Sequence, residues 1–301
     1  MTSPGFGDRV ADAVARRESQ VLLGLDPDPM RLLPEARKYV DDESERAGAV
    51  AGAVWIHCLA LLNAVAPACV GVKLQLACFE RLGLAGWSVL GAVVKAAQHS
   101  GLLVIADGKR GDVPHTAEAY AQALLGSTET PWGPVEGLGA DAVTANPLLG
   151  RDSLEPLVQA ARSKGAGVFV LVRTSNPGAG ALQDEGTPPL RERLAAIVKD
   201  LGADAVGGSG LSDVGAVVAA TQPELMADLR SRMPHAVFLL PGIGAQGGRA
   251  EDAAPAFGGR RGAALVTASR SIADAALAEG SAAAALPAAE RLRDTAWAIS
   301  G

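Results

Sequence analysis

The chain has 301 residues, of which 49% are hydrophobic and 20% are charged, and its formal net charge is −6. This composition is that of a globular protein, and the negative charge argues against an extended nucleic-acid surface, which needs clustered Lys and Arg. The three cysteines form no Cys-x-x-Cys pair, residues 1–17 have no apolar signal-peptide core, and no run of about 18 apolar residues is evident, so we expect a cytoplasmic protein without a membrane span.

Eight short apolar runs recur along the chain, separated by longer stretches rich in Ala, Leu, Glu and Arg. Most runs consist of Val, Leu and Ile without polar alternation, which is typical of parallel strands covered on both faces, and the stretches between them suit helices. The predicted strands are 21–26, 69–74, 102–107, 141–146, 168–173, 204–209, 237–242 and 263–268. The predicted helices are 47–66, 85–100, 114–125, 153–164, 189–201, 213–220, 248–257 and 287–300.

This alternation predicts an α/β fold, a (β/α)₈ barrel with an N-terminal helical extension. An open, doubly wound sheet is the alternative, and the number of strands favours the barrel. We expect a single domain over residues 1–301, with a core at about 20–272 and a C-terminal helical segment at 273–301. Two segments, 126–140 and 174–187, exceed normal loop length. The second follows the fifth predicted strand, where a barrel places its functional loops and long loops are often lids, whereas the first is either a lid or a surface insertion.

Charged residues stand at the ends of the first three predicted strands: Asp26, then Lys73, then the pair Asp107 and Lys109. The C-terminal ends of barrel strands converge on one mouth, so we expect these side chains to meet there. Asp107 and Lys109 are two residues apart and would point to the same side of an extended chain. The pair is either functional or a structural ion pair at the rim. Asp112 follows where the next helix begins, and it is either a functional carboxylate or a helix N-cap.

Alternating Asp and Lys side chains in such a mouth would keep one another ionised, because opposite charges about 4 Å apart at an effective dielectric near 20 interact by roughly 4 kcal/mol. A carboxylate beside the point where a substrate loses negative charge, together with an ammonium that can donate a proton, suits decarboxylation or proton transfer at carbon. No His stands near a predicted strand end with carboxylates at ligand spacing, so the sequence predicts no metal site.

A glycine-rich loop follows the seventh predicted strand, with Gly242, Gly244 and Gly247 in a G-x-G-x-x-G pattern. We do not interpret it as a dinucleotide site, because it lies late in the chain and no acidic residue ends a strand about 20 positions later. Barrels often hold a phosphate on the loops after strands seven and eight, and the loop after strand eight supplies Arg270. We therefore expect the glycine loop and Arg270 to bind a phosphate; the alternative is that Arg270 pairs with a surface acid.

An ordered series of blocks runs from about residue 24 to residue 272: GLDPDP, VKLQ, DGKRGDV, TANPLLG, RTSNPGA, PGIGAQGG and ASRSI. Together they resemble the orotidine 5′-phosphate decarboxylase family, whose signature D-x-K-x-x-D is matched by residues 107–112. The TANPLLG block and the chain length are similar to the bacterial type 2 branch of that family.

The resemblance implies conversion of orotidine 5′-phosphate to UMP and CO₂, the last step of de novo pyrimidine synthesis, without a metal or an organic cofactor. It implies that Lys109 protonates C6 as CO₂ leaves, and that Asp107 lies against the substrate carboxylate and disfavours it. Lys73 would hold the charge of Asp107 and bind a ribose hydroxyl, and Asp26 would contact the ribose.

For the rest of the substrate, the resemblance implies that Ser175 contacts the pyrimidine amide and that Gln246 and Arg270 bridge to the phosphate. Arg173 and Arg249 are the alternatives for these contacts. The phosphate-gripping loop of this family closes over the substrate, which would help to assemble the site.

The resemblance also implies a homodimer, because the second Asp of the family signature reaches into the partner's site. Asp112, and Thr116 one helical turn later, would therefore act in trans.

Two other classes of protein stay open. A sugar-phosphate decarboxylase or aldolase of the same superfamily would share the charged residues but use Mg²⁺. A non-catalytic phosphosugar-binding barrel would have no reason to keep both Lys73 and Lys109.

Overall fold

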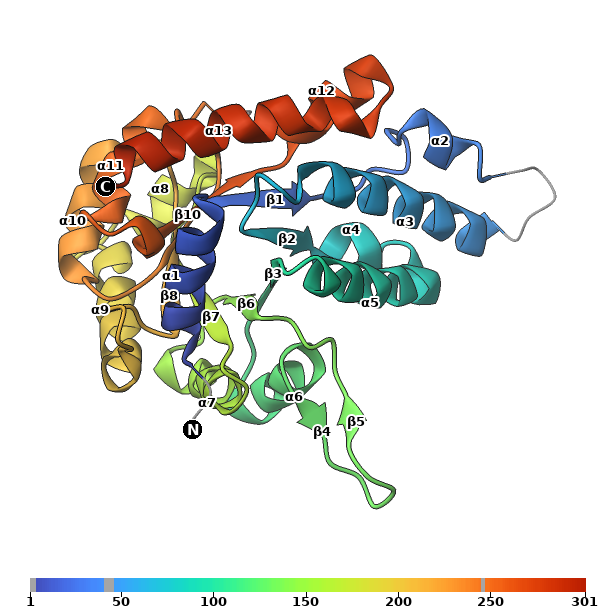
Figure 1. The fold of residues 1–301 in the computed structure, drawn as a ribbon. Helices are drawn as coiled ribbons and strands as arrows, with labels where there is room; N and C mark the ends of the chain where they lie inside the picture. Colours follow the sequence, from blue (N-terminus) through green and yellow to red (C-terminus); the bar gives the residue numbers. More distant parts are fainter. Residues whose placement is uncertain (1–3, 41–45, 245–246) are drawn as a thin grey trace.

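Eight parallel strands close into a barrel in which each strand pairs with its neighbours along the chain (Figure 1). The structure is a computed structural model, and it describes residues 4–40, 46–244 and 247–301. The barrel order is β1, β2, β3, β6, β7, β8, β9 and β10, which returns to β1. The predicted (β/α)₈ barrel is therefore confirmed.

The barrel strands are β1 (Val21–Leu25), β2 (Gly71–Gln75), β3 (Leu103–Arg110), β6 (Ala142–Ala145), β7 (Gly167–Arg173), β8 (Val214–Val218), β9 (Phe238–Leu240) and β10 (Ala264–Ala268). The helices are α1 (Phe6–Arg17), α2 (Pro34–Arg37), α3 (Arg46–Val65), α4 (Leu76–Glu80), α5 (Gly83–His99), α6 (Pro114–Leu124), α7 (Glu155–Ser163), α8 (Gly180–Gln183), α9 (Leu190–Gly202), α10 (Pro223–Arg232), α11 (Ala254–Phe257), α12 (Arg270–Glu279) and α13 (Ala285–Ile299).

Helix α1 is the predicted N-terminal extension, and it covers the N-terminal mouth of the barrel. Its residues Phe6 and Val10 belong to the same buried cluster as the inward-facing strand residues, and the Phe6 ring meets Phe169 of β7 edge to face with 5.8 Å between centroids. Arg9 donates a hydrogen bond to the carbonyl of Gly165, just before β7 begins. Because α1 occupies this mouth, the C-terminal mouth is the one available for a site.

The sixth barrel strand lies in a different segment from the predicted one. Strand β8 is Val214–Val218, where the pattern favoured a helix. The segment 204–209 contains the end of a 3₁₀ turn and a loop, in which Val206 forms an isolated bridge with Ser212. That loop lies under α1, because the Asp8 carboxylate accepts hydrogen bonds from the backbone N–H groups of Gly208 and Ser209. All residues of β8 are buried, and a continuously buried run has no periodicity that separates a strand from a helix.

Two helices also differ from the prediction. The predicted helix at 248–257 is reduced to a 3₁₀ turn and the short α11. Helix α10, which follows β8, was not predicted, because the strand before it was assigned elsewhere.

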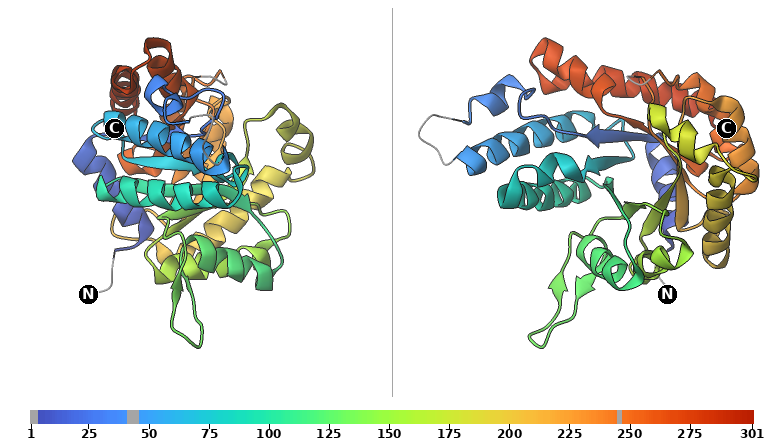
Figure 2. Two further views of the ribbon diagram at one scale, coloured as in Figure 1. Left: turned by 90° about the vertical axis from the view of Figure 1, so that its right-hand side faces the viewer. Right: turned by 180° about the vertical axis from the view of Figure 1, so that it is seen from behind.

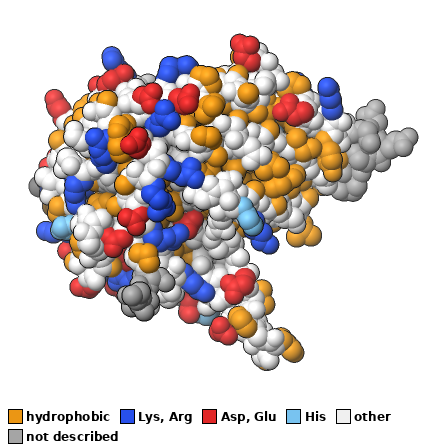
Figure 3. Space-filling view, viewed as in Figure 1, with side chains coloured by type: hydrophobic (Ala, Val, Ile, Leu, Met, Phe, Trp, Pro, Cys, Tyr) orange, Lys and Arg blue, Asp and Glu red, His pale blue; other side chains and the backbone are white. Residues whose placement is uncertain are grey.

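Helix α3 is long and apolar enough to span a membrane by length and composition alone, although His57 and Asn63 interrupt its apolar sequence. Half of its apolar window is buried, and the helix packs against α5, α2 and α13. Figure 3 shows hydrophobic side chains gathered over the side of α3, where Trp55 and Ile56 are half-buried, and charged side chains gathered toward α1 and α10. These contacts are those of an outer helix of the barrel.

The long segment 126–140 contains a two-stranded hairpin, β4 (Ser127–Thr128) and β5 (Val135–Glu136), which projects from the barrel (Figure 1, Figure 2). Trp132 near its tip is 92% exposed. No residue of this segment lines the cavity described below. The structure therefore favours a surface insertion over a lid.

Candidate active site

A cavity of about 600 Å³ opens at the C-terminal ends of the barrel strands. Most of the predicted site residues line it: Asp26, Lys73, Asp107, Lys109, Ser175 and Arg270. Asp112, Thr116 and Gly244 do not line it, and Gln246 lies outside the described residues. The fold thus brings together side chains from four barrel strand ends and from the first turn of α12.

Four charged side chains form a continuous line along the part of the cavity built by β1, β2 and β3. Lys73 Nζ lies 2.7 Å from Asp107 Oδ2 and 3.8 Å from Asp26 Oδ1. Lys109 Nζ lies 2.7 Å from Asp107 Oδ1. The order Asp26, Lys73, Asp107, Lys109 is the alternation of sign that the sequence predicts. Lys73 and Asp107 are buried, whereas the Lys109 side chain is 43% exposed, so its ammonium is accessible from the cavity.

The protonation of the buried pair is set by its partners. Burial acts to raise the pKa of Asp107, but the charges and hydrogen bonds of Lys73 and Lys109 outweigh burial and lower that pKa to about 2. Burial alone would lower the pKa of Lys73, yet the charges of Asp107 and Asp26 raise it above its ordinary value. Both groups are therefore ionised at neutral pH.

The backbone at Lys109 departs from an extended strand. Its φ is +48°, in the left-handed region, and the pairing of β3 with β6 shifts register between Ala106 and Arg110. Asp107 and Lys109 do meet, as predicted, but the stated reason is wrong: they meet across a bulge rather than on one face of an extended chain.

Thr144 on β6 holds this bulge in place. Its hydroxyl accepts a hydrogen bond from the Lys109 backbone N–H at 2.9 Å and donates one to Asp107 Oδ1 at 2.8 Å. The side chain is buried and lines the cavity. Sequence reasoning missed this residue, because a threonine inside an apolar strand carries no charge; its position near the end of the fourth predicted strand was the available signal.

Asp112 and Thr116 lie outside the cavity of their own chain. Asp112 Oδ1 accepts a hydrogen bond from the Val113 N–H at 2.8 Å. The residue in the N-cap position of α6 is Val113, without a side-chain cap, so the N-cap interpretation of Asp112 is not supported.

The loops that follow β3 and β6 lie side by side, because a Cβ placed on Gly111 would lie 2.6 Å from the Asn146 carbonyl oxygen. Exposed apolar side chains follow on both loops: Val113, Leu148 and Leu149 are 53%, 69% and 48% exposed. Exposed apolar side chains gathered on adjoining loops are typical of a surface that contacts another protein.

The glycine loop lies after β9, which is opposite β3 in the barrel order. Gly242, Gly244 and Gly247 all have positive φ, a conformation that L side chains rarely adopt. A Cβ on Gly244 would lie 3.3 Å from Ser271, so the loop packs against the first turn of α12.

Arg270 is exposed and has no hydrogen bond or ion pair with the part of the chain that the structure describes, so the surface-acid alternative is not supported. A free guanidinium, a close glycine backbone and a helix N-terminus together suit a phosphate.

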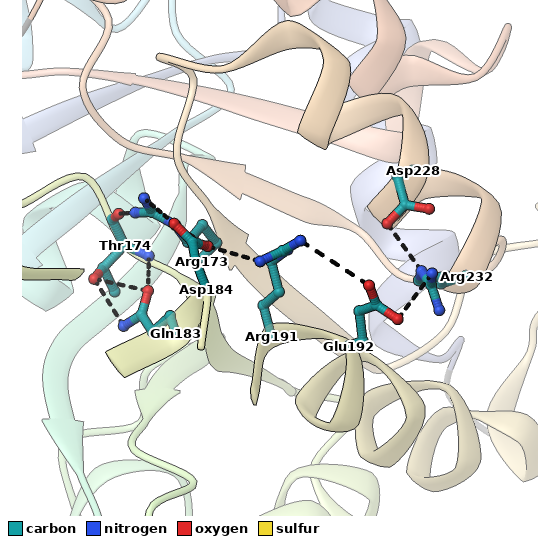
Figure 4. A network of polar contacts seen from close by, with 8 residues as sticks. All are labelled: Arg173, Thr174, Gln183, Asp184, Arg191, Glu192, Asp228 and Arg232. Atoms are coloured by element: carbon teal, nitrogen blue, oxygen red, sulfur yellow. Dashed lines mark hydrogen bonds and ion pairs between the residues drawn. The ribbon is translucent and has the colours of Figure 1, made fainter. Parts of the chain in front are cut away.

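Ser175 lies in the segment between β7 and α9, half-buried and lining the cavity. Arg173, the alternative ligand contact, is buried, and its guanidinium donates two hydrogen bonds to the Asp184 carboxylate at 3.0 and 2.9 Å (Figure 4). Arg173 therefore binds its own segment rather than facing the cavity as a free cation.

Comparisons with known proteins show the family and agree with the barrel fold. Residues 19–285 match the model of the orotidine 5′-phosphate decarboxylase / HUMPS family. The chain is 43% identical to an orotidine 5′-phosphate decarboxylase of Rhodopirellula baltica over 89% of this chain and 87% of that one. It is 41% identical to the one of Deinococcus radiodurans over 90% of this chain and 89% of that one. The solved structure of Leishmania donovani OMP decarboxylase has a TM-score of 0.72 and 31% identity, over 98% of this chain and 99% of that one.

Proposed function

Since the chain belongs to the orotidine 5′-phosphate decarboxylase / HUMPS family, we propose that it is the decarboxylase, a carboxy-lyase that converts orotidine 5′-phosphate to UMP and CO₂ in pyrimidine synthesis. The observation that carries this proposal is the line Asp26, Lys73, Asp107, Lys109 at the cavity wall. Its buried carboxylate is held ionised, and its outermost member is an accessible ammonium.

In the proposed mechanism, the substrate carboxylate lies beside Asp107, where the like charge disfavours it in the ground state. The bond between C6 and the carboxylate carbon breaks, CO₂ leaves, and the electron pair of that bond stays on C6. Lys109 donates its proton to C6, and the resulting neutral amine takes up a proton from solvent. Lys73 keeps Asp107 ionised throughout, because it contacts the carboxylate oxygen that Lys109 does not.

The phosphate of the substrate would bind at the loops after β9 and β10. Arg270 supplies a cation without a partner in the described residues, and the backbone at Gly244 approaches the start of α12. Gln246 is proposed to bridge to the same phosphate. Asp26 and Lys73 would contact the ribose, which lies between the phosphate and the reacting carbon in the substrate. Ser175, on the segment after β7, would contact the pyrimidine amide.

We further propose that the active unit is a homodimer. Asp112 and Thr116 do not reach the cavity of their own chain, and exposed Val113, Leu148 and Leu149 lie on the adjoining loops. Seated against a second copy, this surface would bury the apolar side chains and carry Asp112 and Thr116 into the partner's cavity. Residues 1–301 would form one domain, because α13 packs against α12, α3 and β1, and we propose a cytoplasmic location for it.

The proposal is tested by adding orotidine 5′-phosphate to the purified protein and following loss of the orotate absorbance, with and without excess EDTA. We expect turnover at the same rate in both samples, because every step of the proposed mechanism uses side chains of the protein and none needs a metal ion. Activity that EDTA removes and Mg²⁺ restores would instead indicate a metal-dependent sugar-phosphate enzyme. Binding of the nucleotide without turnover would indicate a non-catalytic barrel.

A further inference from the structure

The cavity wall that faces β1, β2 and β3 includes a segment without any β-strand. Residues 174–189 connect β7 to α9 and contain only a 3₁₀ turn and the four-residue helix α8. Thr174, Ser175, Asn176, Leu182 and Gln183 of this segment line the cavity. Its position therefore depends on side-chain contacts rather than on the hydrogen bonds of a sheet.

Three side chains tie the two ends of this segment together (Figure 4). Arg173 is the last residue of β7 and is buried; its Nε and Nη2 atoms donate to the two oxygens of Asp184 at 3.0 and 2.9 Å. Arg191, in the first turn of α9, donates from Nη1 to Asp184 Oδ1 at 3.0 Å. We call Arg173, Asp184 and Arg191 the clamp. The planar, two-point contact of an arginine with a carboxylate fixes orientation as well as distance.

A second set of contacts fixes the residues on either side of Ser175. The Thr174 backbone N–H donates to Gln183 Oε1 at 2.8 Å, and Gln183 Nε2 donates back to the Thr174 hydroxyl at 3.0 Å. The Thr174 hydroxyl donates to Asn176 Oδ1 at 2.7 Å. The hydroxyl of Ser175 itself makes no hydrogen bond to any described residue, so it is free for a ligand in the cavity.

The part of the network farthest from the cavity consists of ion pairs that are exposed to solvent. Arg232 of α10 pairs with Glu192 and with Asp228, at 2.9 Å each, but the Arg232 and Asp228 side chains are about 40% exposed. Exposed pairs of this type contribute little, because water screens them. The buried Arg173 end is therefore the part of the network that can position the segment.

We propose that the clamp is a positioning device that sets Ser175 over the base half of the ligand, and so determines affinity for the pyrimidine without contributing to the phosphate site. This inference rests on the proposed function, in which the pyrimidine lies against this segment. Arg173, Asp184 and Arg191 are positioning residues, since none of the three lines the cavity.

The test compares two ligands, UMP and ribose 5-phosphate, which differ in the base. For Asp184→Asn, which keeps the shape but removes the charge, we expect the affinity for UMP to fall about tenfold and that for ribose 5-phosphate to change less than about twofold. The kcat/KM for orotidine 5′-phosphate should fall mainly through KM. Asp228→Asn is the matched control at the exposed end, and it should leave both affinities unchanged.

Several outcomes would overturn the clamp. The proposal fails if folded Asp184→Asn loses affinity for UMP and for ribose 5-phosphate equally, or if it loses affinity for neither. If that variant does not fold, Arg191→Met removes the contacts of Arg191 with Asp184 and Glu192 but keeps those of Arg173 with Asp184. It carries the same test, with about a threefold loss of affinity expected for UMP alone. Failure of the proposed function is a separate result: wild-type protein would then bind UMP no better than ribose 5-phosphate.

Discussion

Replacing Thr144 with Val tests the link between the β3 bulge and catalysis. Valine has the shape of threonine but lacks the hydroxyl that bonds both the Lys109 N–H and Asp107 Oδ1. A hydrogen bond to a charged group contributes about 1.5–3 kcal/mol, and an unsatisfied buried donor costs about 1–3 kcal/mol. These terms overlap, so we expect the activation free energy to rise by about 2–4 kcal/mol.

That rise corresponds to a fall of about 30- to 1000-fold in kcat. The KM for orotidine 5′-phosphate should change by less than about threefold, because Thr144 supports the reacting groups rather than the phosphate or the base. Thr144→Ser keeps the hydroxyl and should restore most of the rate. Steady-state kinetics on all three proteins make the measurement, with melting temperatures to show that each is folded.

Thr128→Val, an exposed threonine on the β4–β5 hairpin, is the matched control and should behave as wild type. A folded Thr144→Val variant with the wild-type kcat would refute the argument, because the bulge would then need no side-chain support. So would a variant whose whole loss lies in KM.

Three further predictions concern the subunit interface, the phosphate site and acid stability. Mixing inactive Asp112→Ala with inactive Lys109→Ala subunits should restore part of the activity, because one hybrid site has every residue; no recovery after verified subunit exchange would argue against catalysis in trans. Arg270→Ala should weaken UMP about 10- to 100-fold in calorimetry but leave uridine unaffected, since uridine lacks the phosphate; equal losses would contradict the assignment. The pKa of Asp107 is lowered from 3.8 to about 2, so its ionised form adds about 2 kcal/mol of stability above pH 4 that is lost as the pH falls toward 2. Asp107→Asn should therefore flatten the dependence of the unfolding free energy on pH between 4 and 2, and an unchanged slope in denaturant titrations would contradict the shift.

Much of the barrel could be predicted from the sequence, because its strands are short apolar runs bounded by charged or glycine-rich turns. The charged line could be predicted for the same reason: Asp26, Lys73 and Asp107 each end a run, and strand ends converge in a barrel. Strand β8 is misplaced in the prediction because Val214–Val218 is a continuously buried run, and such a run has no periodicity that separates a strand from a helix.

The supporting contacts could not be predicted, because they depend on bends in the backbone. Thr144 acts through a hydroxyl that contacts a bulge on the neighbouring strand. No local sequence pattern around Lys109 predicts its left-handed φ. Arg173 was read as a possible ligand contact, since a cation at a strand end suits either role. Its partner Asp184 is 11 residues away in a segment without regular structure, so the pairing emerges only in three dimensions.

The most direct test of the central claim is the Lys109→Ala variant beside the wild type, each incubated with orotidine 5′-phosphate while the orotate absorbance is followed. Binding of UMP to both proteins is measured in parallel. The proposed mechanism predicts that the wild type consumes the substrate and that the variant binds nucleotide without turnover, because the Lys109 ammonium beside Asp107 supplies the proton to C6. Turnover by Lys109→Ala at the wild-type rate would contradict it.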